Sequence, residues 1–222
     1  MPIDRDKPID RERVIRAALA LLDEVGLENL TLRRIAAALD VQAPALYWHF
    51  RNKKELLDAM GTAVLMDAAR DGPASWAAMS WQDVLRSYCH RLRAALLRYR
   101  DGAKMVPGTY LADTGMYAVQ EAALGVFTAA GFSADTADMA INTAYSYTVG
   151  FAIEEQAMYL RPGLPDDNYA PQQRLARIDA AVAPTVAQLA TLDRKRATEE
   201  YFAAGLSVIV AGLKTLLAQS KS

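Results

Sequence analysis

Residues 44–54, PALYWHFRNKK, carry three consecutive large ring side chains directly before a group of basic residues. If this stretch is a short helix, Leu46 and Phe50 lie four residues apart on one face, and this pair is enough to pack the helix against a core. The three residues between them, YWH, cannot then all be buried, so at least two must face solvent. Exposed rings beside positive charge are typical of a surface that contacts nucleic acid. The alternative is that Tyr47 and Trp48 stack on a preceding helix and that the lysines form a solvated face.

Two short helices are expected before this stretch. In residues 11–25 apolar side chains recur at helical spacing, with Asp10 available as an N-cap and Gly26 placed where a helix ends in the left-handed conformation. Thr31 can cap a second helix. Asp40 then marks the turn, because Asp tolerates the left-handed conformation better than most residues.

A third helix opens near Gln42, with Pro44 in its first turn, where the missing N–H does no harm. Three short helices, the last two joined by a tight turn, form a helix-turn-helix pattern. The charge also changes here: residues 31–54 hold five basic side chains and one acidic side chain, whereas the whole chain has 25 basic and 26 acidic residues. The chain as a whole has no excess of positive charge, so a polyanionic partner would have to bind to this basic segment.

The rest of the chain is predicted to be helical almost throughout. No segment alternates with period two over a sustained length, so a sheet is not expected and the fold class is all-α. A small N-terminal unit, residues 1–54, is joined by a helix over residues 52–70 to a larger helical part, residues 71–222. The further predicted helices cover residues 81–100, 115–130, 134–160, 172–182, 185–192 and 196–219.

Composition excludes several classes of protein. The one cysteine, Cys89, excludes an intramolecular disulfide, and the two histidines, His49 and His90, are too few for most histidine-based metal sites. No metal and no other cofactor is therefore expected. The N-terminus lacks the apolar segment of a signal peptide, and no apolar run approaches membrane-spanning length. We expect a soluble, cytoplasmic protein without a membrane partner.

An enzyme is not expected either. The acidic pairs Glu154-Glu155 and Asp166-Asp167 are the nearest approach to paired catalytic carboxylates. Adjacent residues of a helix point apart, and the second pair lies in a proline-rich loop. No histidine or nucleophile completes either pair.

Residues 23–60, DEVGLENLTLRRIAAALDVQAPALYWHFRNKKELLDAM, resemble the DNA-binding domain of the TetR family of transcriptional regulators. Weaker similarity continues through RDGAK at 100–104 and IEEQ at 153–156. The resemblance implies a DNA-binding domain in residues 1–54 and a ligand-binding and dimerisation domain in residues 71–222. It further implies a homodimeric repressor that binds a palindromic double-stranded DNA operator and is released by a small-molecule effector. The alternative is a transcriptional activator, or a regulator of the same fold that responds to no effector.

By this similarity, Arg33 contacts a base, the ring triplet and Lys53 hold phosphates and sugars, and Pro44 and Ala45 face bases. The repressors that this segment resembles carry Gln and Thr at reading positions that are Ala43 and Ala45 here. Direct readout is thereby reduced, and a different operator is expected. The residues expected to contact DNA are Thr31, Arg33, Gln42, Ala43, Pro44, Ala45, Tyr47, Trp48, His49 and Lys53.

Two predicted helices, over residues 134–160 and 196–219, carry apolar residues on more than one side. In the second, Val208 lies on a different side from the stripe that contains Phe202 and Leu206. A helix with two apolar sides is buried twice, here against its own subunit and against a second copy, and a symmetric four-helix dimer interface is expected. The alternative is that this helix is central to a large monomer.

The larger helical part is expected to enclose an apolar effector pocket. Some family members hold a drug and its magnesium ion with polar side chains, and the position of the metal-binding histidine is Val106 here. A magnesium chelate is therefore not expected, and a larger, more apolar effector is. Each expected lining residue has core packing as its alternative. These residues are Tyr88, Leu92, Met105, Val106, Thr109, Met116, Phe127, Asn142 and Tyr145.

Overall fold

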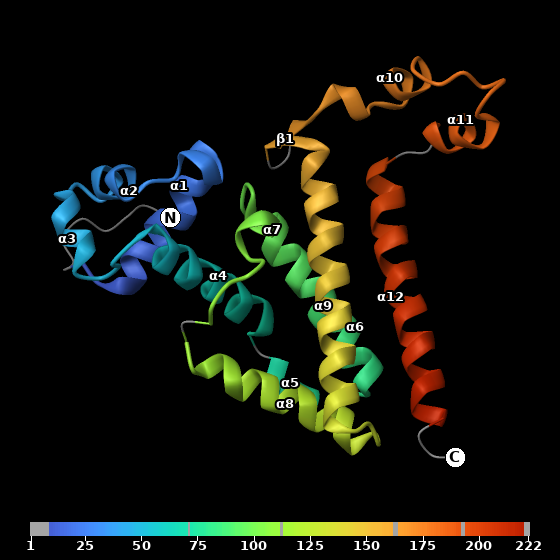
Figure 1. The fold of residues 1–222 in the computed structure, drawn as a ribbon, viewed down its shortest axis with the longest axis horizontal. Helices are drawn as coiled ribbons and strands as arrows, with labels where there is room; N and C mark the ends of the chain where they lie inside the picture. The colour runs from blue at the N-terminus through green and yellow to red at the C-terminus, as the bar shows by residue number, and fades with distance from the viewer. Residues whose placement is uncertain (1–8, 71, 112, 162–163, 192–193, 220–222) are drawn as a thin grey trace. The chain divides into compact units, whose positions relative to one another are not determined.

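The computed structural model describes residues 9–70, 72–111, 113–161, 164–191 and 194–219. The chain divides into two compact units, Met1–Ile153 and Glu154–Ser222. Helices dominate both units, as the predicted all-α class requires (Figure 1).

Four helices form the N-terminal part of the first unit: α1 (Arg11–Asn29), α2 (Leu32–Ala38), α3 (Ala43–Tyr47) and α4 (Lys53–Ala69). The predicted caps are confirmed, because the Asp10 carboxylate accepts a hydrogen bond from the Arg13 N–H and the Thr31 hydroxyl accepts one from the Arg34 N–H. Gly26 has a positive φ of 74° and a ψ of 167°, so helical geometry is interrupted at the predicted position, and a short helical segment follows to Asn29.

The turn between α2 and α3 is also as predicted. Asp40 has a positive φ of 57°, and Pro44 lies in the first turn of α3. The buried residues Ile35 and Leu46 join one hydrophobic core that continues into the next helices through Leu92. The helix-turn-helix is therefore packed on the rest of the first unit.

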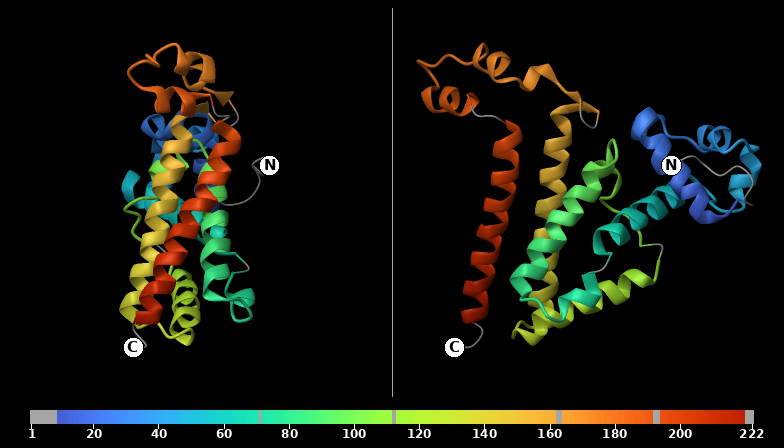
Figure 2. Two further views of the ribbon diagram at one scale, coloured as in Figure 1. Left: turned by 90° about the vertical axis from the view of Figure 1, so that its right-hand side faces the viewer. Right: turned by 180° about the vertical axis from the view of Figure 1, so that it is seen from behind.

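The remaining helices of the first unit are α5 (Gly72–Trp76), α6 (Trp81–Leu97), α7 (Gly102–Met105), α8 (Gly115–Ala129) and α9 (Ala134–Ala157), of which α9 extends into the second unit. Helix α6 packs on α4, and in the view from behind it crosses α9 (Figure 2). The short helices α5 and α7 were not predicted, since each begins at a glycine in a segment that the sequence marks as a break.

The second unit contains the elements β1 (Tyr159–Arg161), β2 (Leu164–Pro165), η1 (Asp167–Tyr169), α10 (Pro171–Leu175), α11 (Pro184–Ala190) and α12 (Arg194–Gln219). The two strands form an antiparallel pair, a small departure from the expected absence of a sheet. The predicted helix over 172–182 is wrong beyond Leu175. There Asp179 accepts hydrogen bonds from the backbone of Ala181 and Val182 and so forms a turn instead.

Helix α12 has two different apolar sides. Phe202 and Leu206 are buried, whereas Tyr201, Val208 and Leu216 are exposed and recur every seven or eight residues. Contrary to the sequence-based expectation, its segment Thr198–Gln219 is long and apolar enough to cross a membrane by length and composition. Apolar residues on two sides produce this high hydropathy, and only 22% of the segment's most apolar window is buried.

Candidate nucleic-acid interface and effector cavity

The residues of α3 and the turn after it divide into a buried pair and an exposed pair. Leu46 and Phe50 are both 0% exposed, whereas Tyr47 is 56% and Trp48 is 89% exposed. His49 is half-buried. The prediction that at least two of the three ring side chains face solvent is confirmed, and the alternative that Tyr47 and Trp48 are stacked away is wrong.

A set of contacts from α1 and α4 holds this turn in place. The Arg11 guanidinium lies 4.2 Å from the centroid of the Phe50 ring and donates hydrogen bonds to the His49 carbonyl and to Glu55 Oε1. The Arg51 N–H donates to Glu55 Oε2 at 2.9 Å. The hydrogen bond from Arg51, followed by that from Arg11, holds the pKa of Glu55 below its usual value. The carboxylate is therefore charged at neutral pH and fixes the backbone behind the exposed rings.

Most of the other residues expected to contact DNA lie on the exposed side of α2 and α3 or at the start of α4, but Ala43 packs against the hydrophobic core. Thr31 uses its hydroxyl as the cap of α2, and Lys53 donates one hydrogen bond from Nζ to the Leu27 carbonyl at 3.1 Å. An ammonium group has three donors, so two have no partner among the residues that the structure describes. Thr31, Arg33, Gln42 and Pro44 are exposed, and Ala43, Ala45 and Lys53 are half-buried.

A cavity of about 410 Å³ lies within the first unit. Its walls come from α4, α5, α6, α8, α9 and from the segment that joins α7 to α8, and they are mostly apolar. Such a volume is typical of a site for a drug-sized molecule. Six of the residues expected in the effector pocket line it: Tyr88, Thr109, Met116, Phe127, Asn142 and Tyr145.

The other three expected pocket residues lie elsewhere. Leu92, Met105 and Val106 are buried in the hydrophobic core and do not line the cavity. Leu92 lies on α6, Met105 ends α7 and Val106 follows it. All three pack in the core, which is the alternative given for each expected lining residue. Val106 carries no metal-binding group in any case.

Twelve lining residues were not among those expected, and Leu65, Trp76, Gln120 and Asp138 are four of them. Two of these four had a usable signal. Gln120 follows Met116 by four residues on α8, and Asp138 precedes Asn142 by four residues on α9, so each lies on the same helical face as a residue that was expected. Trp76 follows a break in the pattern, and no periodicity points to it.

The polar groups of the cavity are phenols, amides and one carboxylate. Burial raises the pKa of Tyr88 and the pKa of Tyr145, so both phenols stay protonated and can donate hydrogen bonds. Asn142 Nδ2 donates to Asp138 Oδ1 at 2.9 Å. The rings of Trp76 and Tyr88 meet edge to face, with centroids 6.4 Å apart.

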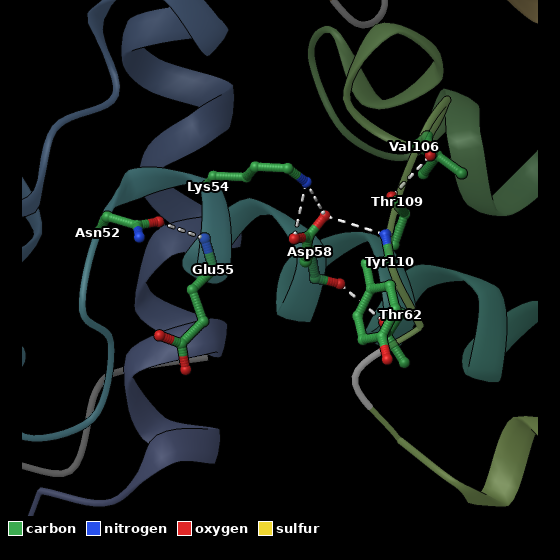
Figure 3. Close-up of polar contacts among 8 residues, drawn as sticks. All are labelled: Asn52, Lys54, Glu55, Asp58, Thr62, Val106, Thr109 and Tyr110. Carbon is green, nitrogen blue, oxygen red and sulfur yellow. Dashed lines mark hydrogen bonds and ion pairs between the residues drawn. The ribbon is translucent and has the colours of Figure 1, made fainter.

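The segment between α7 and α8 contacts both the cavity and α4 (Figure 3). Gly108, Thr109 and Leu111 line the cavity. Between them, the Tyr110 N–H donates to Asp58 Oδ1 on α4 at 3.0 Å, and Asp58 also forms an ion pair with Lys54 at 2.9 Å. A molecule in the cavity therefore touches a segment that is bonded directly to the helix that begins after the exposed rings.

A second set of contacts joins α1 to the start of α7. The Arg100 N–H donates to Asp23 Oδ1 at 2.7 Å, and the Leu27 N–H donates to Asp101 Oδ2 at 3.1 Å. The carbonyl of Leu27 accepts the hydrogen bond from Lys53. The backbone of one residue near the end of α1, Leu27, thus connects the start of α7 with a residue expected to hold a DNA phosphate.

Replacing Gly61 by alanine should lower the free energy of unfolding by about 1–3 kcal/mol. A Cβ atom at this position on α4 would lie 2.3 Å from Thr109 Oγ1, so α4 and the segment after α7 would have to separate. The matched control is Gly125→Ala in α8, where a Cβ meets nothing within 4 Å and helix propensity should add up to about 1 kcal/mol. Urea unfolding followed by circular dichroism measures both, and equal stabilities would contradict the close packing of Gly61 on Thr109.

Comparison with known proteins places these features in a family. The chain matches the model "Bacterial regulatory proteins, tetR family" over residues 14–60 and the model "Tetracyclin repressor-like, C-terminal domain" over residues 76–217. It is 41% identical over 172 residues to the tetracycline repressor protein class D of Escherichia coli, covering 76% of this chain and 78% of that protein.

Solved structures agree with these matches. A possible TetR family transcriptional regulator from Streptomyces coelicolor A3(2) superposes with a TM-score of 0.78 at 33% identity, over 93% of this chain and 100% of that chain. A TetR variant from Acinetobacter baumannii AYE in complex with minocycline gives a TM-score of 0.71 at 31% identity, over 95% of this chain and 99% of that chain.

Proposed function

Because this chain belongs to the TetR family of bacterial transcriptional regulators, we propose that it is a homodimeric repressor that binds a palindromic operator and is released by a small, largely apolar molecule. The exposure of Tyr47 and Trp48 over a buried Phe50 is the observation that carries the DNA-binding half of this proposal. The cavity, whose wall is bonded to α4 through Tyr110, supports the effector half.

In the proposed complex, α3 enters the major groove and the exposed rings pack on sugars and phosphates beside it. Arg33 reaches a base edge, and the two remaining donors of Lys53 hold a phosphate. Ala43 and Ala45 offer no hydrogen bonds from their side chains, so a larger share of the affinity comes from the phosphate backbone. Operator affinity should accordingly fall steeply with salt.

The proposed dimer places two copies of α3 about 34–36 Å apart, one helical turn of DNA. The exposed stripe of α12, formed by Tyr201, Val208 and Leu216, supplies an apolar surface that a second copy can cover. Helix α12 is apolar, yet most of it is not covered by its own chain. A dimer interface on this helix explains its apolar surface without a membrane.

Release follows from a population shift. A molecule that fills the cavity contacts Thr109 and its neighbours, and through Tyr110 and Asp58 it biases the position of α4. Val106 stands where some family members have a histidine that binds magnesium, so this position supplies no imidazole. In the proposed mechanism the effector therefore binds without a metal chelate. Its body is apolar, to match walls that are mostly apolar.

Selection of bound fragments from a random DNA pool tests the proposal directly. A palindromic consensus is expected, and the absence of any enriched sequence would contradict operator binding. Compounds are then screened for release of the selected DNA. A protein that binds the consensus and responds to no compound is the effector-independent regulator, and increased transcription from a promoter that carries the consensus would identify an activator.

Two substitutions should separate base readout from phosphate binding. Arg33→Ala should cost about 1–3 kcal/mol on the selected operator and relax the base preference at one position of each half-site. Lys53→Ala should weaken binding to all DNA alike. The slope of log Kd against the logarithm of the salt concentration should fall by about one, as expected for the loss of one phosphate contact. Fluorescence anisotropy with the operator and with scrambled DNA measures both effects. An Arg33→Ala protein with unchanged selectivity would remove this residue from the readout.

A further inference from the structure

We propose that the cavity selects its ligand by charge: it accepts a polycyclic aromatic molecule that is neutral or singly cationic, with the cationic group beside Asp138, and rejects an anion of the same shape. This inference rests on the proposed function, since it names the chemical class of the effector. It is carried by the single carboxylate on the cavity wall, by the aromatic residues that share this wall and by the volume of the cavity.

The cavity wall has one carboxylate and lacks a compensating cation. Asp138 is the acidic residue of the wall, and among the described residues that line the cavity none is Lys, Arg or His. Asp138 Oδ1 accepts a hydrogen bond from Asn142 Nδ2 at 2.9 Å, which holds the carboxylate on the face of α9 that lines the cavity. Both side chains are exposed, so this carboxylate lines the cavity while it remains in contact with solvent. Within the described part of the chain no hydrogen bond is made to its other oxygen, Oδ2, which can accept one from a ligand ammonium.

An anionic ligand would meet the opposite conditions. It would lose its hydration in a mostly apolar cavity and lie near the Asp138 carboxylate, with no cation on the wall to compensate. One basic side chain acts on a lining residue without itself lining the cavity. Arg91 donates to the Arg70 carbonyl at 2.8 Å and slightly lowers the pKa of Tyr88, but it does not line the cavity and offers no ionic contact inside it.

The aromatic side chains of the cavity wall indicate that the ligand carries fused aromatic rings. Trp76, Tyr88 and Phe127 line the cavity, and the edge-to-face pair of Trp76 and Tyr88 presents a rigid aromatic surface. Flat fused rings stack or meet edge-on with such side chains, and about 410 Å³ holds a body of three to four rings. Gln120 and Tyr145 add polar groups that can orient substituents.

The test uses three ligands of one shape and three charges: anthracenyl-methylamine (cationic), anthracenyl-methanol (neutral) and anthracene carboxylate (anionic). Trp76 in the cavity wall transfers excitation to a bound anthracene, so quenching of tryptophan emission reports binding without DNA. We expect the cation to bind about tenfold or more tightly than the anion, with the neutral compound between them. An anion that binds as tightly as the cation would overturn the inference.

Asp138→Asn assigns the selectivity to one carboxylate. This substitution keeps the shape and should bring the cation within about threefold of the neutral compound while improving the anion. The matched control is Asp135→Asn, an exposed residue of the same helix outside the cavity wall, which should leave the order of the three ligands unchanged. An unchanged order in Asp138→Asn would overturn the assignment, and so would an equal effect of Asp135→Asn.

The outcomes also separate this inference from the proposed function. Binding of none of the three compounds would overturn the inference, while operator selection and the release screen would still stand on their own measurements. Conversely, charge-ordered binding by a protein that enriches no DNA sequence would leave the cavity as a binding site and remove the proposed repressor.

Discussion

Replacing Val208 by aspartate should convert the protein into a monomer that keeps its helical content and loses about 100-fold or more of its operator affinity. Val208 is 72% exposed on α12, in the same stripe as Tyr201 and Leu216. In a symmetric interface the substitution buries two unpaired carboxylates, one from each copy, and an uncompensated buried charge is strongly destabilising. The affinity loss follows because each half-site would then be bound independently.

The matched control for this variant is Val182→Asp. Val182 is 80% exposed but lies outside α12, between α10 and α11, so an added charge there should leave the dimer intact. Light scattering after size-exclusion chromatography gives the mass of the particle, circular dichroism gives the helix content, and anisotropy gives the operator affinity. A dimeric Val208→Asp protein, or a wild-type protein that is monomeric, would contradict the proposed interface.

Replacing Asp58 by alanine should separate effector binding from DNA release. The substitution removes the acceptor of the Tyr110 N–H and the partner of Lys54 on α4. The coupling between two sites in such proteins is typically 1–3 kcal/mol, so the effector-induced change in operator Kd should shrink by about tenfold. Effector affinity itself should change little, because Asp58 does not line the cavity.

Asp58→Asn is the control for this variant, since its amide oxygen can still accept the hydrogen bond from Tyr110 and only the charge is lost. Operator Kd is measured by anisotropy with and without a compound from the release screen, and effector Kd by tryptophan quenching. Retained release in Asp58→Ala would show that the coupling runs by another route, of which the contacts of Asp101 with Leu27 are the nearest.

Interactions between residues close in sequence were sufficient to predict the helices and turns of the N-terminal part. The caps at Asp10 and Thr31, the positive φ of Asp40 and the buried pair Leu46 and Phe50 all depend on neighbours along the chain. Each is a backbone or i, i+4 effect that needs no distant partner. The exposure of the rings between the buried pair followed from the same short-range geometry.

Local signals failed where a competing local bond or a short helix broke the pattern. The helix expected over 172–182 ends at Leu175 because the turn at Asp179 provides other partners for the backbone N–H groups. The short helices α5 and α7 begin at Gly72 and Gly102, where glycine normally predicts an interruption. At Gly102 an added Cβ atom would lie 2.3 Å from the carbonyl oxygen of Leu96, so this position requires glycine for close packing as well as for a break.

By itself the sequence determined the helical class, the helix-turn-helix and the residues that this element exposes. Only the tertiary structure decided the cavity: Leu92 and Val106 are apolar yet lie in the core, whereas Trp76 and Asp138 line the open volume. Helical periodicity states which residues share a face, but it does not state which faces meet across an unfilled space. That depends on how helices distant in the chain are spaced, and hence on the packing of the whole unit.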